Sequence, residues 1–349
     1  MRIYLCILVL FCISCNFKLR DCKEINIENV NCVDTLNYSS EKSVELLYPS
    51  RINIVDQFLI ITNEKNTSFF DVYDLSSMEK IISFGKKGKG PREYLMPSIY
   101  ATQIVNDSAF LCVFDVLKRI DCRINLSGVI KNCNLLPTIE KLPNKLGIPE
   151  KIIYKSTDTI IFSPDSDMDH ARFCIYSYET NKKLQIKYLP ELDYDISKIN
   201  CYPIYNNVSS CYSDSLGVFA ATSVMLGQVD FFRKNGQYLY SSVIERQEKL
   251  KYGSENHLIF RHSPTRYHTD LRDYDGYVYL LYSKINGEGQ VSNSEIYKLD
   301  WKGKVIKKIV MNKVCVSFDI SEKDGCLYAV TYDNFNYSVI KCNLSNEKL

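Results

Sequence analysis

The chain has 349 residues, of which 46% are hydrophobic and 24% charged, so a large folded core is expected. This length allows either two average domains or one large all-β domain. The 43 basic and 41 acidic residues nearly cancel to a net charge of +2, which gives no long-range attraction to nucleic acid, and no nucleic-acid partner is expected. With 26 Tyr and 16 Phe but only 14 Gly, the composition favours strands over helices.

The N-terminus has the pattern of an export signal. Arg2 precedes an apolar run of 11 residues, 3–13, which is too short to span a bilayer and is typical of a signal-peptide core. Ser14-Cys15 follows and is similar to a lipobox, although Cys12 stands where that motif usually has Leu. We therefore predict a signal peptide at 1–14 and lipidation of Cys15. An ordinary signal peptide and an uncleaved anchor are the alternatives.

No later apolar run approaches the ~20 residues that span a membrane, so membrane contact is expected through the lipid anchor only. Residues 15–22 are predicted to be a linker, and 23–349 a single folded domain. Of the 14 cysteines, 11 follow Cys15, and this odd number cannot pair completely within one chain. Several of them, such as Cys112 and Cys174, lie in apolar runs and are expected to be small core residues, with room for a disulfide or two.

One short pattern recurs six times along the chain: an Asp, then Gln, Ser, Thr or Gly, then an apolar strand. The copies are 49 to 61 residues apart and begin at Asp56, Asp107, Asp158, Asp214, Asp275 and Asp324. An Asp at a tight turn can accept hydrogen bonds from backbone N–H groups. We therefore predict that the repeated Asp has a structural role in the turn after the innermost strand of each repeat.

Each copy is followed by a second strand with alternating residues, and most by a third. The predicted second strands are 69–75, 118–126, 172–179, 228–235, 295–303 and 338–344. The predicted third strands are 80–85, 128–136, 238–244 and 304–311. About fifty residues with four short strands are typical of a propeller blade, so the predicted fold is an all-β, six-bladed β-propeller. A pair of β-sandwiches or a β-helix is the alternative.

The last repeat ends too soon to hold its own outermost strand. The alternating segments 24–30 and 43–49 precede the first Asp copy. We therefore predict that the N-terminal region supplies the missing strand to the last blade and closes the ring.

The segment FGKKGKGPREYLMP, residues 84–97, combines glycines with positive charge. Its four cations make it a candidate anion-binding site: Lys86, Lys87, Lys89 and Arg92. It is not a Walker A loop, because Pro91-Arg92 replaces Lys-Ser/Thr. The structural alternative is a crossover between the first two blades, with Pro91 stiffening the turn and Tyr94 packed inward.

The stretch G-x-x-G-x-G-P-x-E-Y from Gly85 to Tyr94, together with the lipobox-like start, resembles the six-bladed β-propeller lipoproteins of Bacteroidetes that are described as TolB-like or NHL-like. Arg92 replaces the small residue typical of its position. The resemblance covers nearly the whole chain and implies a six-bladed fold and a cell-envelope location. It implies no established activity and no catalytic residue.

Other candidate sites lack a complete motif. The alternating carboxylates of 165–170 fail the EF-hand pattern, because its sixth position is His170 in place of Gly. The group His257, His262 and His268 has no metal-binding spacing. No nucleophile signature occurs, and no catalytic residue, metal or cofactor is predicted.

The expected function is a lipid-anchored binding or scaffold module for a peptide, glycan or protein of the cell envelope. The alternative is a hydrolase or lyase whose site gathers residues from several blades at the mouth of the central channel. A sensory or assembly role in a membrane complex is a third possibility. Residues 16–20 contain no acidic cluster after Cys15, which favours a periplasm-facing protein over surface display. We expect a monomer.

Overall fold

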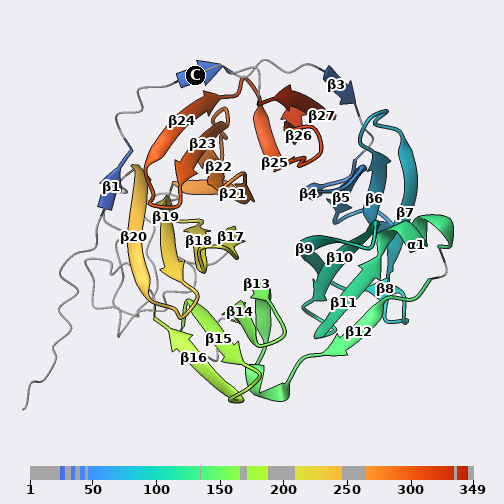
Figure 1. Ribbon diagram of the computed structural model, residues 1–349. Coiled ribbons are helices and arrows are strands. Elements are labelled where there is room, and N and C mark those ends of the chain that lie inside the picture. The colour runs from blue at the N-terminus through green and yellow to red at the C-terminus, as the bar shows by residue number, and fades with distance from the viewer. Residues whose placement is uncertain are drawn as a thin grey trace, which may run out of the picture.

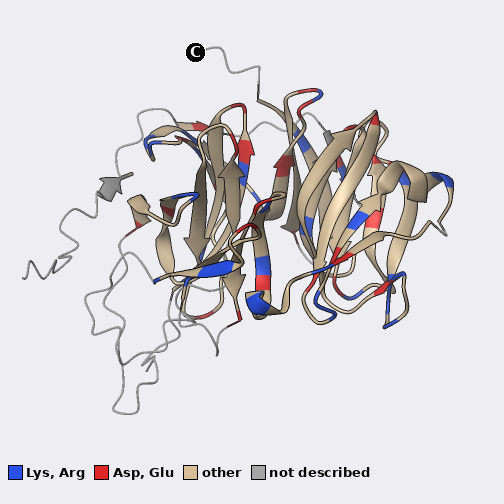
Figure 2. Ribbon diagram, turned by 60° about the horizontal axis from the view of Figure 1, so that its bottom comes forward, with Lys and Arg blue, Asp and Glu red and all other residues tan. Residues whose placement is uncertain are grey.

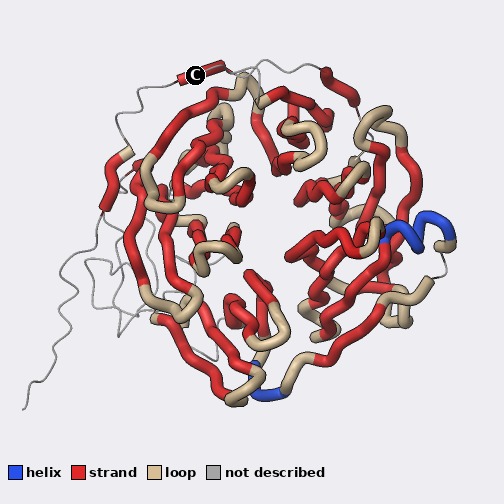
Figure 3. The backbone as a smooth tube through the Cα atoms, viewed as in Figure 1, coloured by secondary structure: helices blue, strands red, loops and turns tan. Residues whose placement is uncertain are grey.

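The fold is a ring of six antiparallel sheets around a central opening (Figure 1). The computed structural model describes residues 24–27, 33–35, 40–43, 46–133, 135–165, 171–187, 209–245, 265–333 and 336–344. Within each sheet the strands that follow residue 48 run in chain order from the centre to the rim, and three sheets add an N-terminal strand at the rim (Figure 3). The predicted six-bladed β-propeller is confirmed.

Blades 1 to 3 occupy the first half of the ring. Blade 1 contains β4 (Pro49–Val55), β5 (Phe58–Asn63), β6 (Ser68–Asp74), β7 (Lys80–Lys87) and β8 (Glu93–Tyr94). Blade 2 contains β9 (Pro97–Val105), β10 (Ser108–Asp115), β11 (Ile120–Asn125) and β12 (Thr138–Lys141). A short 3-10 helix, η1 (Asn144–Leu146), leads to blade 3, which contains β13 (Pro149–Lys155), β14 (Thr159–Pro164), β15 (Phe173–Ser177) and β16 (Lys182–Ile186).

Blades 4 to 6 each include a strand from the N-terminal region. Blade 4 contains β17 (Ser210–Ser213), β18 (Val218–Ser223), β19 (Leu226–Arg233), β20 (Tyr238–Glu245) and β1 (Glu24–Asn26). Blade 5 contains β21 (Arg266–Tyr274), β22 (Tyr277–Ile285), β23 (Glu295–Asp300), β24 (Val305–Val310) and β2 (Val33–Thr35). Blade 6 contains β25 (Val314–Ile320), β26 (Cys326–Asp333), β27 (Asn336–Asn343) and β3 (Ser40–Ser43).

All six repeated Asp residues lie where the prediction placed them, in the turn between the innermost strand of a blade and the next strand. Three of them have left-handed backbone conformations, with φ of 51° at Asp56, 58° at Asp107 and 50° at Asp275. Asp tolerates this conformation better than most residues, and two-residue hairpin turns require it. The repeat is therefore a turn signal.

The core consists of layers between blades. In the described part of the chain, six buried clusters each join two neighbouring blades, including blades 6 and 1. Seven of the eight described cysteines are buried and all eight are free, which confirms their role as core residues; Cys133 is exposed. Each blade is thus stabilised by both neighbours, and the ring has no end blade.

The predicted third strand at 128–136 is wrong, because the chain forms helix α1 (Leu126–Lys131) there. The Asn125 side chain caps the helix by accepting a hydrogen bond of 2.8 Å from the backbone N–H of Gly128. Leu126 and Val129, three positions apart, are buried on one face of the helix against the core between blades 1 and 2. The outer strand of blade 2 is β12, which pairs with β11.

The N-terminal region closes the ring as predicted, and it also adds an outer strand to each of two other blades. β3 pairs antiparallel with β27 and supplies the outer strand of blade 6. Before that, β1 pairs in parallel with β20, and β2 in parallel with β24. The three strands thus run along the rims of blades 4, 5 and 6 in turn (Figure 1). The ring-closing strand is 40–43, which overlaps the alternating segment 43–49 only at Ser43, whereas the segment 24–30 contains β1 on blade 4.

Candidate functional site

Two cavities lie at opposite ends of the innermost strands. Cavity A, of about 700 Å³, is lined by residues from the beginnings of these strands, such as Arg51, Ser98 and Lys151. Cavity B, of about 880 Å³, is lined by residues from their ends and from the Asp turns, such as Tyr154 and Asp273. Each cavity has lining residues from all six blades. Both have the volume of a site for a small ligand.

A network of charged side chains lies between the two cavities. Residues two apart on a strand share a face, so Asp270 and Arg272 of β21 both face the channel. Arg272 donates to Asp270 Oδ1 at 2.6 Å, to Asp319 Oδ1 at 3.1 Å and to the carbonyl oxygen of Ile52 at 2.9 Å. This links blades 5, 6 and 1, while Ser209 Oγ of blade 4 donates to Asp270 at 2.9 Å. Figure 2 shows residues of both charges on strands around the middle of the ring.

Burial and charge shift the two acids of this network in opposite directions. The charge of Arg272 and hydrogen bonds from Ser317 and Ser209 outweigh burial and lower the pKa of Asp270 to about 2. Burial raises the pKa of Asp319, although Arg272 and two backbone N–H groups oppose the rise. Asp270 is therefore the ionised partner that holds Arg272 in place.

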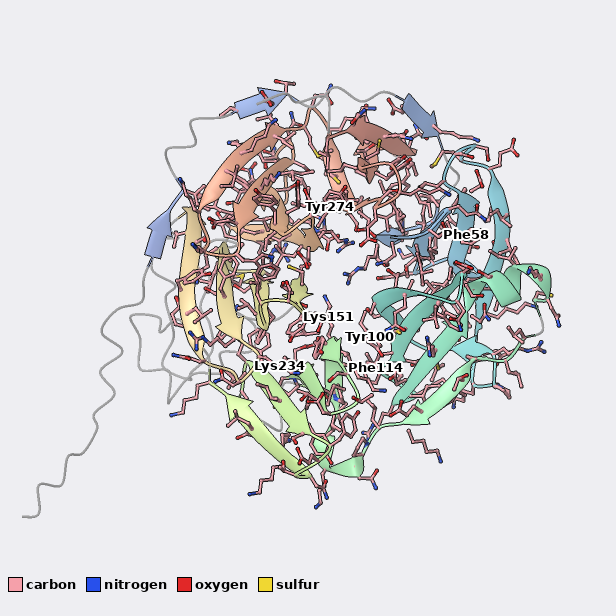
Figure 4. All side chains as sticks on the ribbon, viewed as in Figure 1. Phe58, Tyr100, Phe114, Lys151, Lys234 and Tyr274 are labelled. Carbon is pink, nitrogen blue, oxygen red and sulfur yellow. The ribbon has the colours of Figure 1, made fainter. Side chains whose placement is uncertain are left out.

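Two cations from distant parts of the sequence line cavity A, and one of them, Arg51, also lines cavity B. Arg51 projects from β4 and Lys151 from β13, and both are half-buried. Burial, with repulsion from Arg272, lowers the pKa of Arg51 to about 10. Burial, with repulsion from Arg51, lowers the pKa of Lys151 to about 7. Figure 4 shows Lys151 beside the central opening.

The Nε atom of Arg51 is shielded from solvent and has no hydrogen-bond partner within the described part of the chain. Buried polar atoms are nearly always hydrogen-bonded, so an orphaned donor on a charged group indicates a missing partner. The lining of cavity A thus combines the cations Arg51, Lys87 and Lys151 with the acids Glu64, Glu150 and Asp270.

On the side of blades 1 and 2 the wall of cavity A has both polar residues, such as Ser50, Thr62 and Glu64, and apolar ones. Its apolar members there are Phe69, Leu95, Met96, Pro97, Ile99 and Val116. Hydroxyl groups of Ser98, Ser163 and Thr269 are spread around the remainder. His268 also lines the cavity, and its Nε2 donates to the carbonyl oxygen of Val316 at 2.5 Å, so this ring is tied to blade 6.

Cavity B is rich in tyrosine, and its charged groups are largely engaged with one another. The rings of Tyr154 and Tyr212 contact each other at a tilt of 30° with centroids 3.8 Å apart, and Tyr154 donates to Asp214 at 3.0 Å. Lys155 pairs with Asp121 at 2.5 Å and with Glu140 at 2.7 Å. Asp273 differs, since burial raises its pKa to about 6, with further contributions from Glu322 and Asp214.

The predicted anion-binding residues lie on the outer part of blade 1 and in the crossover to blade 2. Lys86, Lys87, Lys89 and Arg92 are all exposed. Of the four, Lys87 lines cavity A, where its Nζ donates to the carbonyl oxygen of Glu64 at 2.6 Å. Anion binding by these residues stays a prediction.

The glycines and the glutamate of this segment have a structural explanation. Glu93 accepts a hydrogen bond of 2.7 Å from the backbone N–H of Gly90, and a Cβ added at Gly88 would lie 2.1 Å from the Glu93 carboxylate. Lys118 of blade 2 donates to the carbonyl oxygens of Gly90 and Glu93, both at 2.9 Å. Tyr94 is buried and meets the Phe70 ring edge-to-face at 5.9 Å. The segment is the crossover between the first two blades, with Tyr94 packed inward.

Other predicted site residues lie outside the described residues: Cys15, His257, His262 and 166–170. Among the residues that the structure places, no group of three His, Cys, Asp or Glu side chains is arranged to hold a metal ion. No helix within these described ranges has the length and apolar character to cross a membrane.

The sequence analysis missed Arg51 and Lys151, which lie one hundred positions apart. The available signal was a cation near the start of an otherwise apolar innermost strand, in RINIV and in EKIIY. In a six-fold ring, all innermost strands face one channel, so such cations must converge.

The fold and its cavities define a six-bladed β-propeller with a ligand-sized cavity at each end of a partitioned channel. Residues 23–157 match the family described as TolB-like 6-blade propeller-like. This match and the six-bladed structure confirm the resemblance predicted from the sequence. Among curated proteins, none matches the chain.

Two solved structures from Bacteroides share the fold. A member of the DUF4221 family from Bacteroides vulgatus has a TM-score of 0.57 and 12% identity, over 88% of this chain and 97% of that chain. A "putative exported protein" from Bacteroides fragilis has a TM-score of 0.54 and 12% identity, over 91% of this chain and 98% of that chain. At this identity the likeness shows the fold alone.

Proposed function

We propose that the protein is an exported binding module that holds its ligand in cavity A. The observation that carries this proposal is a cavity of about 700 Å³ that is lined by all six blades and includes two half-buried cations, Arg51 and Lys151. Burial lowers the pKa of both cations, and a bound ligand that compensates their desolvated charges would be stabilised there.

Cavity A is a better candidate than cavity B because of how the charges are used. In cavity B, Lys155 and Tyr154 already engage carboxylates, and Lys323 lies 3.7 Å from Asp56. In cavity A, the acids near the cations are Glu64, Glu150 and Asp270, and Asp270 already accepts hydrogen bonds from Arg272, Ser317 and Ser209.

Photocrosslinking from the two cavities in whole cells tests this assignment. Met96 lines cavity A and Ile104 lines cavity B; both lie in blade 2, and they are 54% and 57% exposed. With benzoylphenylalanine in place of each residue in turn, we expect a reproducible cross-linked product from position 96 and none from position 104. Equal labelling, or labelling at position 104 alone, would contradict the proposal.

The same proposal places the protein in the cell envelope, held by a lipid on Cys15 and facing the periplasm. The signal-like N-terminus supports export. The Bacteroides fragilis protein with the same fold is called an exported protein, which also supports export. Intact-mass measurement of the membrane fraction tests the anchor. The wild type is expected to lack residues 1–14 and to carry acyl mass, and Cys15→Ala to carry none. Cleavage of both chains without lipid would contradict lipid anchoring.

A further inference from the structure

We propose that blades 1 and 2 carry a docking surface for an acidic polypeptide segment, on the loops beside cavity A. This surface, the basic face, consists of residues 64–67, 85–96 and 116–119. Lys87 and Met96 belong to it and also line cavity A. The inference goes beyond the proposed function, because it concerns the exterior of the ring and not the interior of the cavity.

Hydrogen bonds hold the three segments of the basic face together. Lys87 Nζ donates to the carbonyl oxygen of Glu64 at 2.6 Å, which joins the first segment to the second. Lys118 Nζ donates to the carbonyl oxygens of Gly90 and Glu93, both at 2.9 Å, which joins the third segment to the second. The basic face is therefore one continuous surface.

Positive charge is concentrated on the basic face. It contains seven cations and two acids, whereas the whole chain has a net charge of only +2. One of the acids, Glu93, accepts a hydrogen bond of 2.7 Å from the backbone N–H of Gly90, and the nearby Asp115 is buried. Two acids cannot neutralise seven cations, and a local surplus of this kind attracts anionic partners. The seven cations are Lys65, Lys86, Lys87, Lys89, Arg92, Lys118 and Arg119.

Exposed apolar side chains lie among these cations. Leu117 is 63% exposed, Met96 is 54% exposed, and Tyr48 beside the first segment is 57% exposed. Lys65 Nζ lies 3.2 Å from the centroid of the Tyr48 ring. Apolar groups exposed together and bordered by polar ones are typical of a protein-binding surface. A polypeptide with carboxylates and apolar side chains would match both features, whereas a polyphosphate chain would leave the apolar groups uncovered.

The position of the N-terminal region favours a polypeptide over the bilayer as the partner. Strand β1 lies on the rim of blade 4, across the central opening from blade 1 (Figure 1). Cys15 precedes Glu24 by nine positions, and nine extended residues span about 30 Å. The lipid predicted on Cys15 would therefore hold blade 4 nearest the membrane, with the basic face on the far side of the ring.

Fluorescence anisotropy with labelled octapeptides tests the inference, using the full chain with Cys15→Ala to remove the predicted lipid. The probes alternate Glu with Leu, Gln with Leu, and Glu with Ser. The Glu–Leu peptide is expected to bind about tenfold more tightly than the other two. Its affinity should fall as salt is raised to about 0.5 M, because salt screens exposed charges. Equal binding of the Gln–Leu or Glu–Ser peptide, or no binding of the Glu–Leu peptide, would overturn the proposal.

A triple variant locates the anionic contacts. Lys86→Gln, Lys89→Gln and Arg119→Gln together change exposed residues of the basic face and are expected to weaken binding of the Glu–Leu peptide about tenfold. If circular dichroism shows loss of folding, the three single variants replace it, and each is expected to weaken binding about twofold. Unchanged affinity in the folded variants would overturn the assignment.

A matched control removes the same charge elsewhere. Lys182→Gln, Lys302→Gln and Lys304→Gln together change exposed residues of blades 3 and 5, and are expected to leave the affinity unchanged. Leu117→Ser tests the apolar contact and is expected to weaken the Glu–Leu peptide about threefold without affecting the Glu–Ser peptide. Equal losses in the two triple variants would show a general effect of net charge and overturn the proposal.

The same assay separates the other anionic partners. Phosphatidylglycerol vesicles and a single-stranded oligonucleotide are each added as competitors. Displacement of the Glu–Leu peptide by either one, with tighter binding that is lost in the basic-face triple variant, would assign the surface to a membrane or to nucleic acid and overturn the proposal. Failure of the peptide to bind leaves cavity A unaffected, and absence of cross-linking at position 96 leaves the basic face unaffected.

Discussion

A buried ion pair between blades 3 and 4 gives a sharp test of how neighbouring blades are held together. Arg172 Nη1 lies 2.7 Å from Asp230 Oδ2, and the two side chains are 1% and 0% exposed. Gln228 donates to the other oxygen of Asp230 at 2.7 Å, and Ser241 Oγ also donates to it. The perturbation is Asp230→Ala, which removes the acid and leaves the guanidinium between the two sheets.

The expected loss of stability is large because a buried charge loses its partner. Breaking a buried pair from one side costs about 3–5 kcal/mol. Arg172 also lies over the rings of Phe173 and Phe232, at 5.1 Å and 5.4 Å from their centroids, and these contacts stay in the variant. We therefore expect a loss near the middle of that range, about 4 kcal/mol.

The double variant Arg172→Met with Asp230→Leu separates the pair from the packing around it. Replacing both partners by apolar groups of similar volume is often neutral for stability. The free energy of unfolding of this double variant is therefore expected to lie within about 1 kcal/mol of the wild-type value. Urea denaturation followed by circular dichroism measures both free energies of unfolding. A loss below about 1 kcal/mol for Asp230→Ala, or equal losses in the single and double variants, would refute the reasoning.

Three further outcomes follow from other parts of the ring. Folding lowers the pKa of Asp270 from 3.8 to about 2, so the ionised carboxylate stabilises the fold fully above pH 3.8, and this contribution is lost as the pH falls through about 2. In urea unfolding measured at several pH values, Asp270→Asn should therefore lose less stability between about pH 4 and pH 2 than the wild type does. Gly88→Ala should lower the free energy of unfolding by about 1–3 kcal/mol, because φ at this position is +150° and the added Cβ would meet Glu93. Gly217→Ala is the control: its φ is +61° and its Cβ would enter open space, so thermal unfolding should show a smaller loss of stability. Deleting residues 16–43 removes β1, β2 and β3 and should give self-association in size-exclusion chromatography, because three sheet edges become exposed; an unchanged elution volume would show that these edges need no cover.

The parts of the fold that repeat could be predicted from the sequence. The Asp turns identify each blade because every blade has a tight turn after its innermost strand, and the same residue type occupies that turn in all six blades. Helix α1 was missed because Val129 and Ile130 have the composition of a strand, and the decisive residue, the capping Asn125, precedes them. The pairing of β1 and β2 was not predicted, because strands of three residues are too short to show a hydrophobic alternation. Their partners also lie some two hundred or more positions away in the sequence.

The candidate site was harder to predict than the fold. Arg51 and Lys151 each look like an ordinary charged residue at the start of a strand, and only closure of the ring brings them into one cavity. The basic segment at 84–97 was more conspicuous, but its glycines are explained by the Glu93 turn and by the packing of Tyr94. Local composition thus identified a crossover, while the convergent cations depend on the arrangement of the whole ring.

The path of β1, β2 and β3 imposes an order on folding. These strands are synthesised before their partners: Glu24 pairs with Ser241, Val33 with Lys308 and Ser40 with Lys341, each partner lying further along the chain than the last. Each strand must therefore wait, unpaired, until its own partner has emerged, β1 for the shortest time and β3 for the longest, and contacts between such distant residues form slowly. Ring completion is the last step, and a chain stalled before its final blade would present unpaired edges to chaperones and proteases.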